Sequence, residues 1–395
     1  MANDLQHFIP ELWSKRIQAW KRRIMVATQI TNSEERGTLV FGDVVHRPYS
    51  SDIYVNDLTR GNAVEIQDIN STDETMTINN YKESSFYVDL ADKVQSKYDP
   101  EKIYTEKTGY ELANEVDMTV LREVTNATYT FDDGSIGGTA GNGIALTGST
   151  THSVFADLEA EMTAADIEAT NPRCVVAGPK VIANINKAFV ASGFQTADST
   201  LKNGYMGMFQ GFQTYKSNNL THRQLLTIAA NLTAAETITI NGVVFTIKAA
   251  ASATVAGDIA LGASAALTAQ NIIDAVNGTG TPGASTYIAI SAANRKILKS
   301  KKITASLSGT QNVLFLGAGK MTLSEATAQG SFGTQVCMNI ACKKGAIDLV
   351  MQLEPTVQIN KVSDKTGYNV LTVDLYGVKT FKEGRDRMFA FWTVA

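Results

Sequence analysis

The residues that could carry chemistry are few, and they are spread over the whole sequence. A zinc site needs cysteines and histidines a few positions apart, and a nucleophilic enzyme needs a nucleophile beside a base. The histidines and cysteines show no such spacing and form no Cys-x-x-Cys: His7, His46, His152, His222, Cys174, Cys337 and Cys342. Three thiols cannot all pair, so we expect buried, reduced thiols. The sequence indicates no catalytic residue, no metal site and no cofactor, and we do not expect an enzyme.

A glycine-rich stretch at 134–143 (GSIGGTAGNG) is the other candidate for chemistry. Phosphate-binding loops end in Lys-Ser or Lys-Thr, and dinucleotide-binding loops carry G-x-G-x-x-G between a strand and a helix. The stretch matches neither pattern. We expect a flexible loop over 128–150, in which the acid pair Asp132-Asp133 is simply hydrated.

A short N-terminal segment combines an apolar face with a basic face. Residues 9–30 predict an amphipathic helix, with Pro10 in its first turn. The apolar face would dock onto the protein itself or onto a neighbouring subunit, and it consists of Trp13, Ile17, Trp20 and Ile24. The basic face consists of Lys15, Arg16, Lys21, Arg22 and Arg23. Two roles are open for the basic face: a solvated surface, or contact with a polyanion.

Length and composition indicate a globular protein with more than one core. The chain has 395 residues, of which 44% are hydrophobic and 19% charged, and its formal net charge is −4. The sequence contains no run of 18 apolar residues, which is about the length that a helix needs to cross a membrane. Residues 1–10 lack the apolar core of a signal peptide. We expect a soluble protein that is made in the cytoplasm and has no membrane contact.

Composition changes abruptly at about residue 223 and changes back at about 328. Between these points the chain is rich in Ala, Thr, Gly and Ser, and its aromatic residues are Phe245, Tyr287 and Phe315. A segment that begins and ends within a continuing pattern is typical of a small domain inserted into a loop of a larger one. Such an insertion, in a chain without catalytic motifs, favours an assembly protein over an enzyme.

The inserted segment has its own secondary-structure signals. Asn241-Gly242 lies between two alternating runs, which is the strongest short signal for a β-hairpin. The pattern further predicts a helix at 267–276 and strands at 286–291 and 303–307. We expect a small β-rich or α+β module.

Before the insertion, the pattern predicts a hairpin and then a long helix. The stretch 50–80 is too polar to form a core, so we expect a hairpin that projects from the body and needs a neighbour to pack on. A helix is predicted at 99–126, with Asp99 as its N-cap. The predicted strands lie at 38–41 and 43–47, before a break at Pro48, and at 63–69, 75–78 and 86–90.

The order of these elements resembles the major capsid proteins of tailed bacteriophages, which have the Hong Kong ninety-seven fold. A basic N-terminal helix, a polar hairpin and a long acid-capped helix follow one another as they do in that family. Three further stretches carry the resemblance: 171–180 (NPRCVVAGPK), 207–220 (GMFQGFQTYKSNNL) and 376–381 (YGVKTF). The similarity covers the chain outside 223–328 and points to the branch that carries an inserted domain.

The resemblance implies an α+β fold whose parts have known names in the family. These parts are an N-arm at 1–37, an E-loop with flanking P-domain strands at 38–98, the P-domain spine helix and a loop at 99–150, an A-domain with the remaining P-domain at 151–222 and 329–395, and an inserted surface domain at 223–328.

The family also implies partners. The chain would assemble with itself into the pentamers and hexamers of an icosahedral head in the host cytoplasm. A portal protein, packaged double-stranded DNA and, in some heads, a decoration protein would complete the virion. The basic N-arm would face DNA or acidic scaffold groups without sequence specificity. Because the sequence begins almost directly with the N-arm, we expect a separate scaffolding protein.

Some members of the family link the E-loop to a neighbour through a Lys–Asn isopeptide bond. No lysine occurs here between Arg23 and Tyr81. We therefore expect no such bond at the loop tip, and Lys82 at the loop base is the nearest candidate.

The sequence thus favours a structural capsid protein of a tailed double-stranded DNA phage. An encapsulin-like shell protein and a glycan-binding surface protein are the alternatives, and a hydrolase or transferase lacks any supporting motif. Shell formation would support the capsid protein, and genes for cargo enzymes next to this gene would support the encapsulin-like protein. Glycan binding by 223–328 would support the surface protein.

Overall fold

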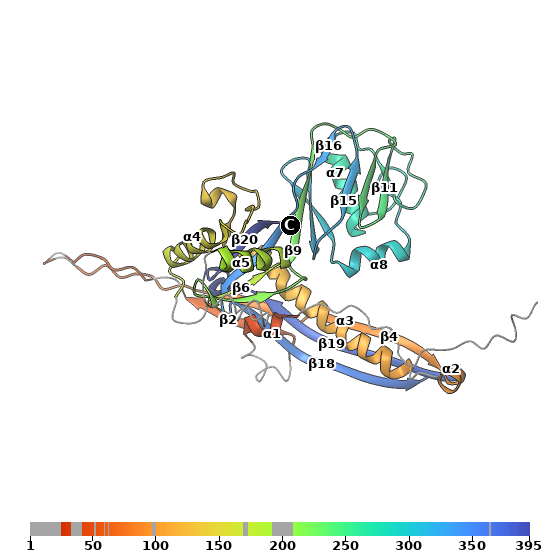
Figure 1. Cartoon of the computed structure of the whole chain (residues 1–395), viewed down its shortest axis with the longest axis horizontal. Coiled ribbons are helices and arrows are strands. Elements are labelled where there is room, and N and C mark those ends of the chain that lie inside the picture. The colour runs from red at the N-terminus through yellow and green to blue at the C-terminus, as the bar shows by residue number, and fades with distance from the viewer. Residues whose placement is uncertain are drawn as a thin grey trace, which may run out of the picture.

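The computed structural model describes residues 25–32, 42–50, 53–58, 60–61, 63–96, 100–168, 173–191, 208–362 and 365–395. Within these ranges helices and strands mix in an α+β arrangement (Figure 1). No helix of the described part is long and apolar enough to span a membrane. The predicted strand at 38–41 and the predicted N-cap Asp99 lie outside the described residues.

A long, narrow sheet forms the lower layer of the molecule in Figure 1. Its longest strands lie beneath the helix α3, and the short helix α2 (Leu90–Gln95) follows at one end. The strand order is β1 (Thr31–Asn32), β18 (Ile347–Lys361), β19 (Gly367–Lys379) and β4 (Asn80–Asp89).

Helix α3 (Pro100–Arg122) continues into the 3-10 turn η3 (Glu123–Asn126), as the sequence predicted for 99–126. Val116, Val120 and Val124 are buried, and their spacing of four places them on one face. That face also carries the buried Asp117, whose Oδ1 accepts the backbone N–H groups of Val26 and Ala27.

The contact with Asp117 limits the helix that was predicted at 9–30. In the described part of that range only α1 (Ala27–Ile30) is helical, and residues 25–26 are not. The prediction is wrong at 25–26, because the carboxylate of Asp117 takes the N–H groups and starts a new helix at this point. The rest of the predicted helix lies outside the described residues.

A ten-stranded sheet forms the centre of the molecule. Helices α4 (Thr151–Ala164) and α5 (Pro179–Ala191) pack on it through a cluster that includes Phe155, Phe212 and Phe391. The main path runs β13 (Thr304–Ser308), β14 (Asn312–Ala318), β9 (Thr221–Ile228), β17 (Val336–Lys343), β6 (Arg173–Ala177), β8 (Phe212–Lys216) and β7 (Met208–Phe209). Three strands lie off this path: β16 (Gly330–Phe332) on β9, β20 (Met388–Val394) on β17, and β5 (Tyr129–Phe131) on β20.

A separate hydrophobic cluster lies entirely between Leu226 and Phe332. We call this part the 226–332 region. Asn241 (φ 48°) and Gly242 (φ 83°) form the tight turn of its predicted hairpin. Its own sheet is ordered β12 (Asp258–Ala260), β11 (Val243–Lys248), β10 (Thr237–Ile240) and β15 (Leu323–Ala326), with helices α7 (Ala265–Asn277) and α8 (Ala292–Ser300).

Strand β9 belongs to both parts of the molecule. Its first residues pair with β17, Thr221 to Leu226 pair with β14, and its last residues pair with β16. The boundary expected between 222 and 223 therefore falls inside one continuous strand.

Strands β2 (Val44–Ser50) and β3 (Ser71–Thr77) form a two-stranded sheet, and the chain between them extends from the body as a ribbon (Figure 1). The predicted break at Pro48 is wrong, because β2 is an edge strand, where a proline removes no ladder bond. The predicted strand at 63–69 is also wrong: the described residues 63–70 have no strand pairing.

Two further expectations are corrected. Residues 128–150, expected to be a loop throughout, contain the strand β5 and the 3-10 turn η4 (Asp133–Ile136). Asp132 and Asp133 accept backbone N–H groups of this loop, including Gly141 and Thr139, so they are not merely hydrated. In place of a strand at 286–291, the structure has a single bridge between Tyr287 and Ile259.

Candidate functional site

The ribbon of residues 53–70 carries several large apolar side chains that are exposed to solvent rather than packed in a core. Val55 is 100% and Ile66 88% exposed. The same holds for their neighbours Ile53, Tyr54, Leu58, Val64 and Ile69. A group of large apolar side chains exposed on one segment indicates an interaction site.

Side chains hold the two arms of the ribbon together. The Tyr54 N–H donates to Gln67 Oε1 at 3.0 Å, and Gln67 Nε2 donates to the Tyr54 carbonyl at 2.6 Å. Asn56 Nδ2 donates to Glu65 Oε2 at 3.2 Å. These side-chain bonds join the two arms in place of a backbone ladder, and two of them use the backbone N–H and carbonyl of Tyr54.

The base of the ribbon packs on the long sheet. Val45 and Met76 are buried in a small cluster with Val350 and Phe381. The guanidinium carbon of Arg47 lies 4.3 Å from the centre of the Phe381 ring, at cation–π distance. The base is therefore fixed by apolar contacts.

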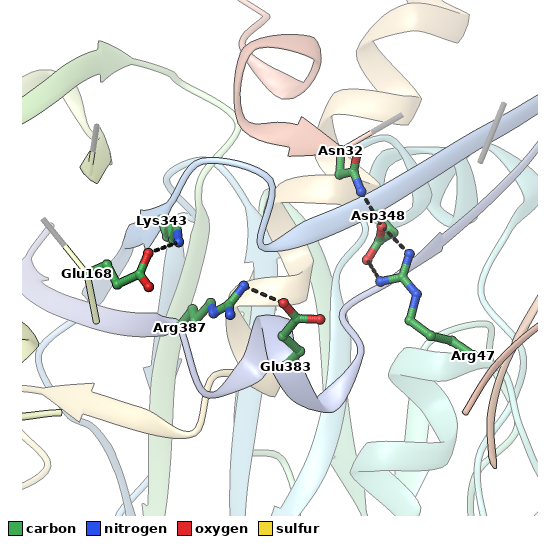
Figure 2. A network of polar contacts seen from close by, with 7 residues as sticks. All are labelled: Asn32, Arg47, Glu168, Lys343, Asp348, Glu383 and Arg387. Atoms are coloured by element: carbon green, nitrogen blue, oxygen red, sulfur yellow. Dashed lines mark hydrogen bonds and ion pairs between the residues drawn. The ribbon is translucent and has the colours of Figure 1, made fainter. Parts of the chain in front are cut away.

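A buried carboxylate joins three separate segments at this base (Figure 2). Both oxygens of Asp348, on β18, accept from the Arg47 guanidinium at 3.1 Å. Asn32 Nδ2, on β1, donates to Asp348 Oδ1 at 3.2 Å. The Asp348 side chain is only 4% exposed. One carboxylate thus ties the ribbon and the end of the N-terminal segment to the body.

Further ion pairs lie around the same polar pocket, which has a volume of about 380 Å³. Lys343 Nζ lies 2.8 Å from Glu168 Oε2, and Arg387 pairs with Glu383 on helix α9 (Lys382–Arg385). Figure 2 shows these pairs next to the Asp348 group. Each cation drawn there forms an ion pair with a carboxylate, so the charged groups around the pocket serve to join segments of the chain.

Glu74, on β3, makes a second clamp. Its carboxylate accepts from the Arg385 guanidinium at 2.6 Å and from the Lys382 N–H at 2.8 Å. Desolvation by burial would raise the pKa of Glu74, but the hydrogen bonds from Arg385 and Lys382 outweigh it and lower the pKa. The ionised form of Glu74 therefore holds the ribbon base to α9.

Two basic side chains connect helix α3 with the 226–332 region, one from each side. Lys302 Nζ lies 2.9 Å from Glu115 Oε1 and also donates to the Thr119 hydroxyl. In return, Arg122 donates to the Lys302 carbonyl at 2.8 Å and to Thr304. Desolvation lowers the pKa of Lys302 although Glu115 opposes this effect. We call this group the α3 latch.

Asp374 lies in the long sheet beneath α3 and is 0% exposed. Among the described residues neither of its carboxylate oxygens has a hydrogen-bond partner. Burial raises the pKa of Asp374 to about 6; Lys82 lowers the pKa and Glu115 adds to the increase. Lys82 itself lies 3.7 Å from Glu115 Oε1.

The thiols are buried, as expected. Cys174 Sγ and Cys342 Sγ are 3.3 Å apart, which is hydrogen-bond distance and far longer than a disulfide. This hydrogen bond and burial raise the pKa of Cys342 well above its usual value, and burial raises that of Cys337 to about 12. Neither thiol is activated as a nucleophile.

The histidines lie apart from one another in the described part of the chain. His46 contacts Asp73, His152 contacts Gln210, and His222 is buried. Burial lowers the pKa of His222 to about 4. Throughout the described ranges, no three His, Cys, Asp or Glu residues are grouped so that they could hold a metal ion.

The N-terminal candidates lie outside the described residues, so their roles stay predictions: Trp13, Ile17, Trp20, Ile24, Lys15, Arg16, Lys21, Arg22 and Arg23. Sequence reasoning missed Asp117, Asp348 and Asp374. Asp348 and Asp374 are each a single acid within an apolar stretch, and this isolation is a signal that could have found them.

Solved structures similar to this chain come from phages. A chain from Mycobacterium phage Che8 has a TM-score of 0.58 and 16% identity, covering 97% of this chain and 96% of its own. A chain in the head structure of Helicobacter pylori bacteriophage KHP40 has a TM-score of 0.53 and 9% identity, with coverages of 99% and 98%. A chain in the capsid of Myoviridae phage XM1 has a TM-score of 0.51 and 9% identity, with coverages of 100% and 99%.

Neither models of known protein families nor the sequences of curated proteins gave a match. The structural likeness nevertheless spans the chain almost completely. The α+β fold of tailed-phage capsid proteins, predicted from the order of sequence elements, is confirmed.

Proposed function

We propose that this chain is the structural major capsid protein of a tailed double-stranded DNA phage, and that it self-assembles into the icosahedral head. The observation that carries this proposal is the ribbon of residues 53–70, whose apolar side chains find no cover within one chain. Burial of such a surface by a second copy would stabilise association by about 25 cal/mol for each Å² removed from water.

The fold supports this proposal. Two of the similar chains named above come from a phage capsid and a phage head, which favours a phage head over an encapsulin-like compartment or a glycan-binding protein. The chemistry of the described residues agrees with a structural role, because the buried thiols are protonated and the ion pairs join segments of the chain to one another.

The family names then apply to the chain as proposals. Residues 1–37 serve as the N-arm, the projecting ribbon as the E-loop and α3 as the spine helix. The segment 223–328 serves as an inserted surface domain. Pentamers and hexamers of the chain would need a separate scaffolding protein and a portal protein, and would enclose DNA by non-specific contact.

The test is assembly of the full chain, produced alone and together with its scaffolding protein. Electron microscopy and sedimentation should show closed icosahedral shells. A species that stays monomeric at high concentration with the scaffolding protein present would contradict the proposal.

A further inference from the structure

The stretch from residue 275 to 324 contains no acidic residue. It contains these basic residues: Arg295, Lys296, Lys299, Lys301, Lys302 and Lys320. A run of one sign in a chain with a nearly balanced total charge creates a local positive field.

The structure divides these cations into internal and external groups. Arg295 donates to the carbonyls of Val276 and Ala275, and Lys302 belongs to the α3 latch. Lys296 and Lys299 are exposed, and neither has a hydrogen-bond or ion-pair partner among the described residues. Three positions apart on α8, they point from one face of the helix.

The lysine face of α8 also has an apolar component and a fixed place. Ile297, beside the two lysines, is 41% exposed. Lys302 lies two positions after the last residue of α8, so the α3 latch holds this end of the helix near α3. Figure 1 shows α8 at the lower edge of the 226–332 region, above α3.

The ribbon carries the complementary properties. Asp57, Glu65 and Asp68 are exposed among its apolar side chains, and Arg60 is its one described cation. In Figure 1 the ribbon leaves the body on the side opposite α8, so it cannot reach the α8 of its own chain.

We propose that the acidic ribbon of one copy docks against the lysine face of α8, formed by Lys296 and Lys299, in a second copy. This inference rests on the proposed function, because it names the surface of the neighbour that receives the ribbon. Apolar contacts around Ile297 supply affinity, while the charges set the register and speed the encounter. A ribbon partner accounts for the exposed Ile297, whereas binding of nucleic acid would use the lysines alone.

Charge exchange tests the contact in the full chain, with the scaffolding protein where the wild type needs it. The readout is the protein concentration at half-maximal assembly, measured by light scattering. Lys296→Glu/Lys299→Glu and Asp57→Lys/Asp68→Lys should each raise this concentration about tenfold, because like charges then meet. Combining all four substitutions should bring it back to within about threefold of the wild type.

Lys187→Glu/Lys216→Glu changes the net charge by the same amount on other exposed lysines and should assemble like the wild type. Circular dichroism of the unassembled variants checks that each is folded. The inference is overturned if the α8 variant assembles like this control, if the combined variant is no better than its parents, or if the α8 variant loses only bound DNA. In each of these cases wild-type shells still form, so the proposed function stands.

Discussion

Arg47 and Asp348 are 301 positions apart in the sequence, yet they form a bidentate ion pair with both N–O distances at 3.1 Å. The pair is asymmetric, because the carboxylate is 4% exposed and the guanidinium 28%. Removal of the arginine leaves a buried charge without its counterion, whereas removal of the carboxylate leaves a cation that water can reach. This difference decides which substitution costs more.

Arg47→Met should therefore destabilise the unassembled chain by about 3 kcal/mol, and Asp348→Asn by only about 1–2 kcal/mol. Urea unfolding followed by circular dichroism measures both. Asp157→Asn, an exposed carboxylate on α4, is the control and should change little. An equal or reversed order of the two effects would contradict the role given to Asp348.

Substitutions on the ribbon should separate stability from assembly. Val55→Asp/Ile66→Asp should leave the unfolding free energy of the single chain within about 0.5 kcal/mol, since neither side chain packs within it. The same variant should form no shells when examined by electron microscopy. Val255→Asp, an exposed apolar position in the 226–332 region, should assemble normally. Loss of stability in the ribbon variant would show that the ribbon packs on its own chain.

The buried Asp374 predicts a defined pH dependence. Its pKa is raised to about 6 in the folded chain, above the usual value near 4 in the unfolded chain. Between about pH 4 and 6, Asp374 is therefore protonated in the folded chain but ionised in the unfolded chain. The stability that this difference contributes is lost as the pH rises through that range. Asp374→Asn should remove this loss and stabilise the chain by about 1–2 kcal/mol at pH 7.

The measurement is the difference in thermal unfolding between Asp374→Asn and the wild type from pH 4 to 8. A difference is required because His222, with its pKa lowered to about 4, has the opposite slope: its contribution is lost as the pH falls from about 6.5 to 4. An Asp374→Asn difference that does not change with pH would mean that the carboxylate is solvated.

The α3 latch should couple two parts of the chain. Lys302→Met removes the cation that bridges Glu115 and Thr119, and should cost about 1–3 kcal/mol. Amide hydrogen exchange should then increase together in α3 and in the 302–304 segment. Lys299→Met, on the exposed face of α8, should leave exchange unchanged. If only 302–304 responded, the two parts would not be coupled through this contact.

Local signals in the sequence predicted much of the fold. Asn241 and Gly242 predicted their turn, because these residue types tolerate the positive φ that a tight hairpin requires. The helix predicted at 99–126 is present as α3 and η3. The order of such elements was sufficient to indicate the capsid-protein fold.

Alternation alone was misleading where no partner strand was present. Residues 63–69 alternate as a strand does, yet they extend along the ribbon without a ladder. Pro48 suggested a break, but an edge strand tolerates it. In both cases the outcome depended on what lies beside the segment, which sequence periodicity does not encode.

By itself, then, the sequence determined the turn at Asn241-Gly242, helices α3 and α7 and the polarity of the ribbon, because these depend on residues a few positions apart. Only the tertiary structure decided that Asp348 would meet Arg47, that Asp374 would be buried, and that β9 would pair with both β17 and β14. Such contacts join distant segments, and the packing of the whole chain selects them from many pairings of similar local energy.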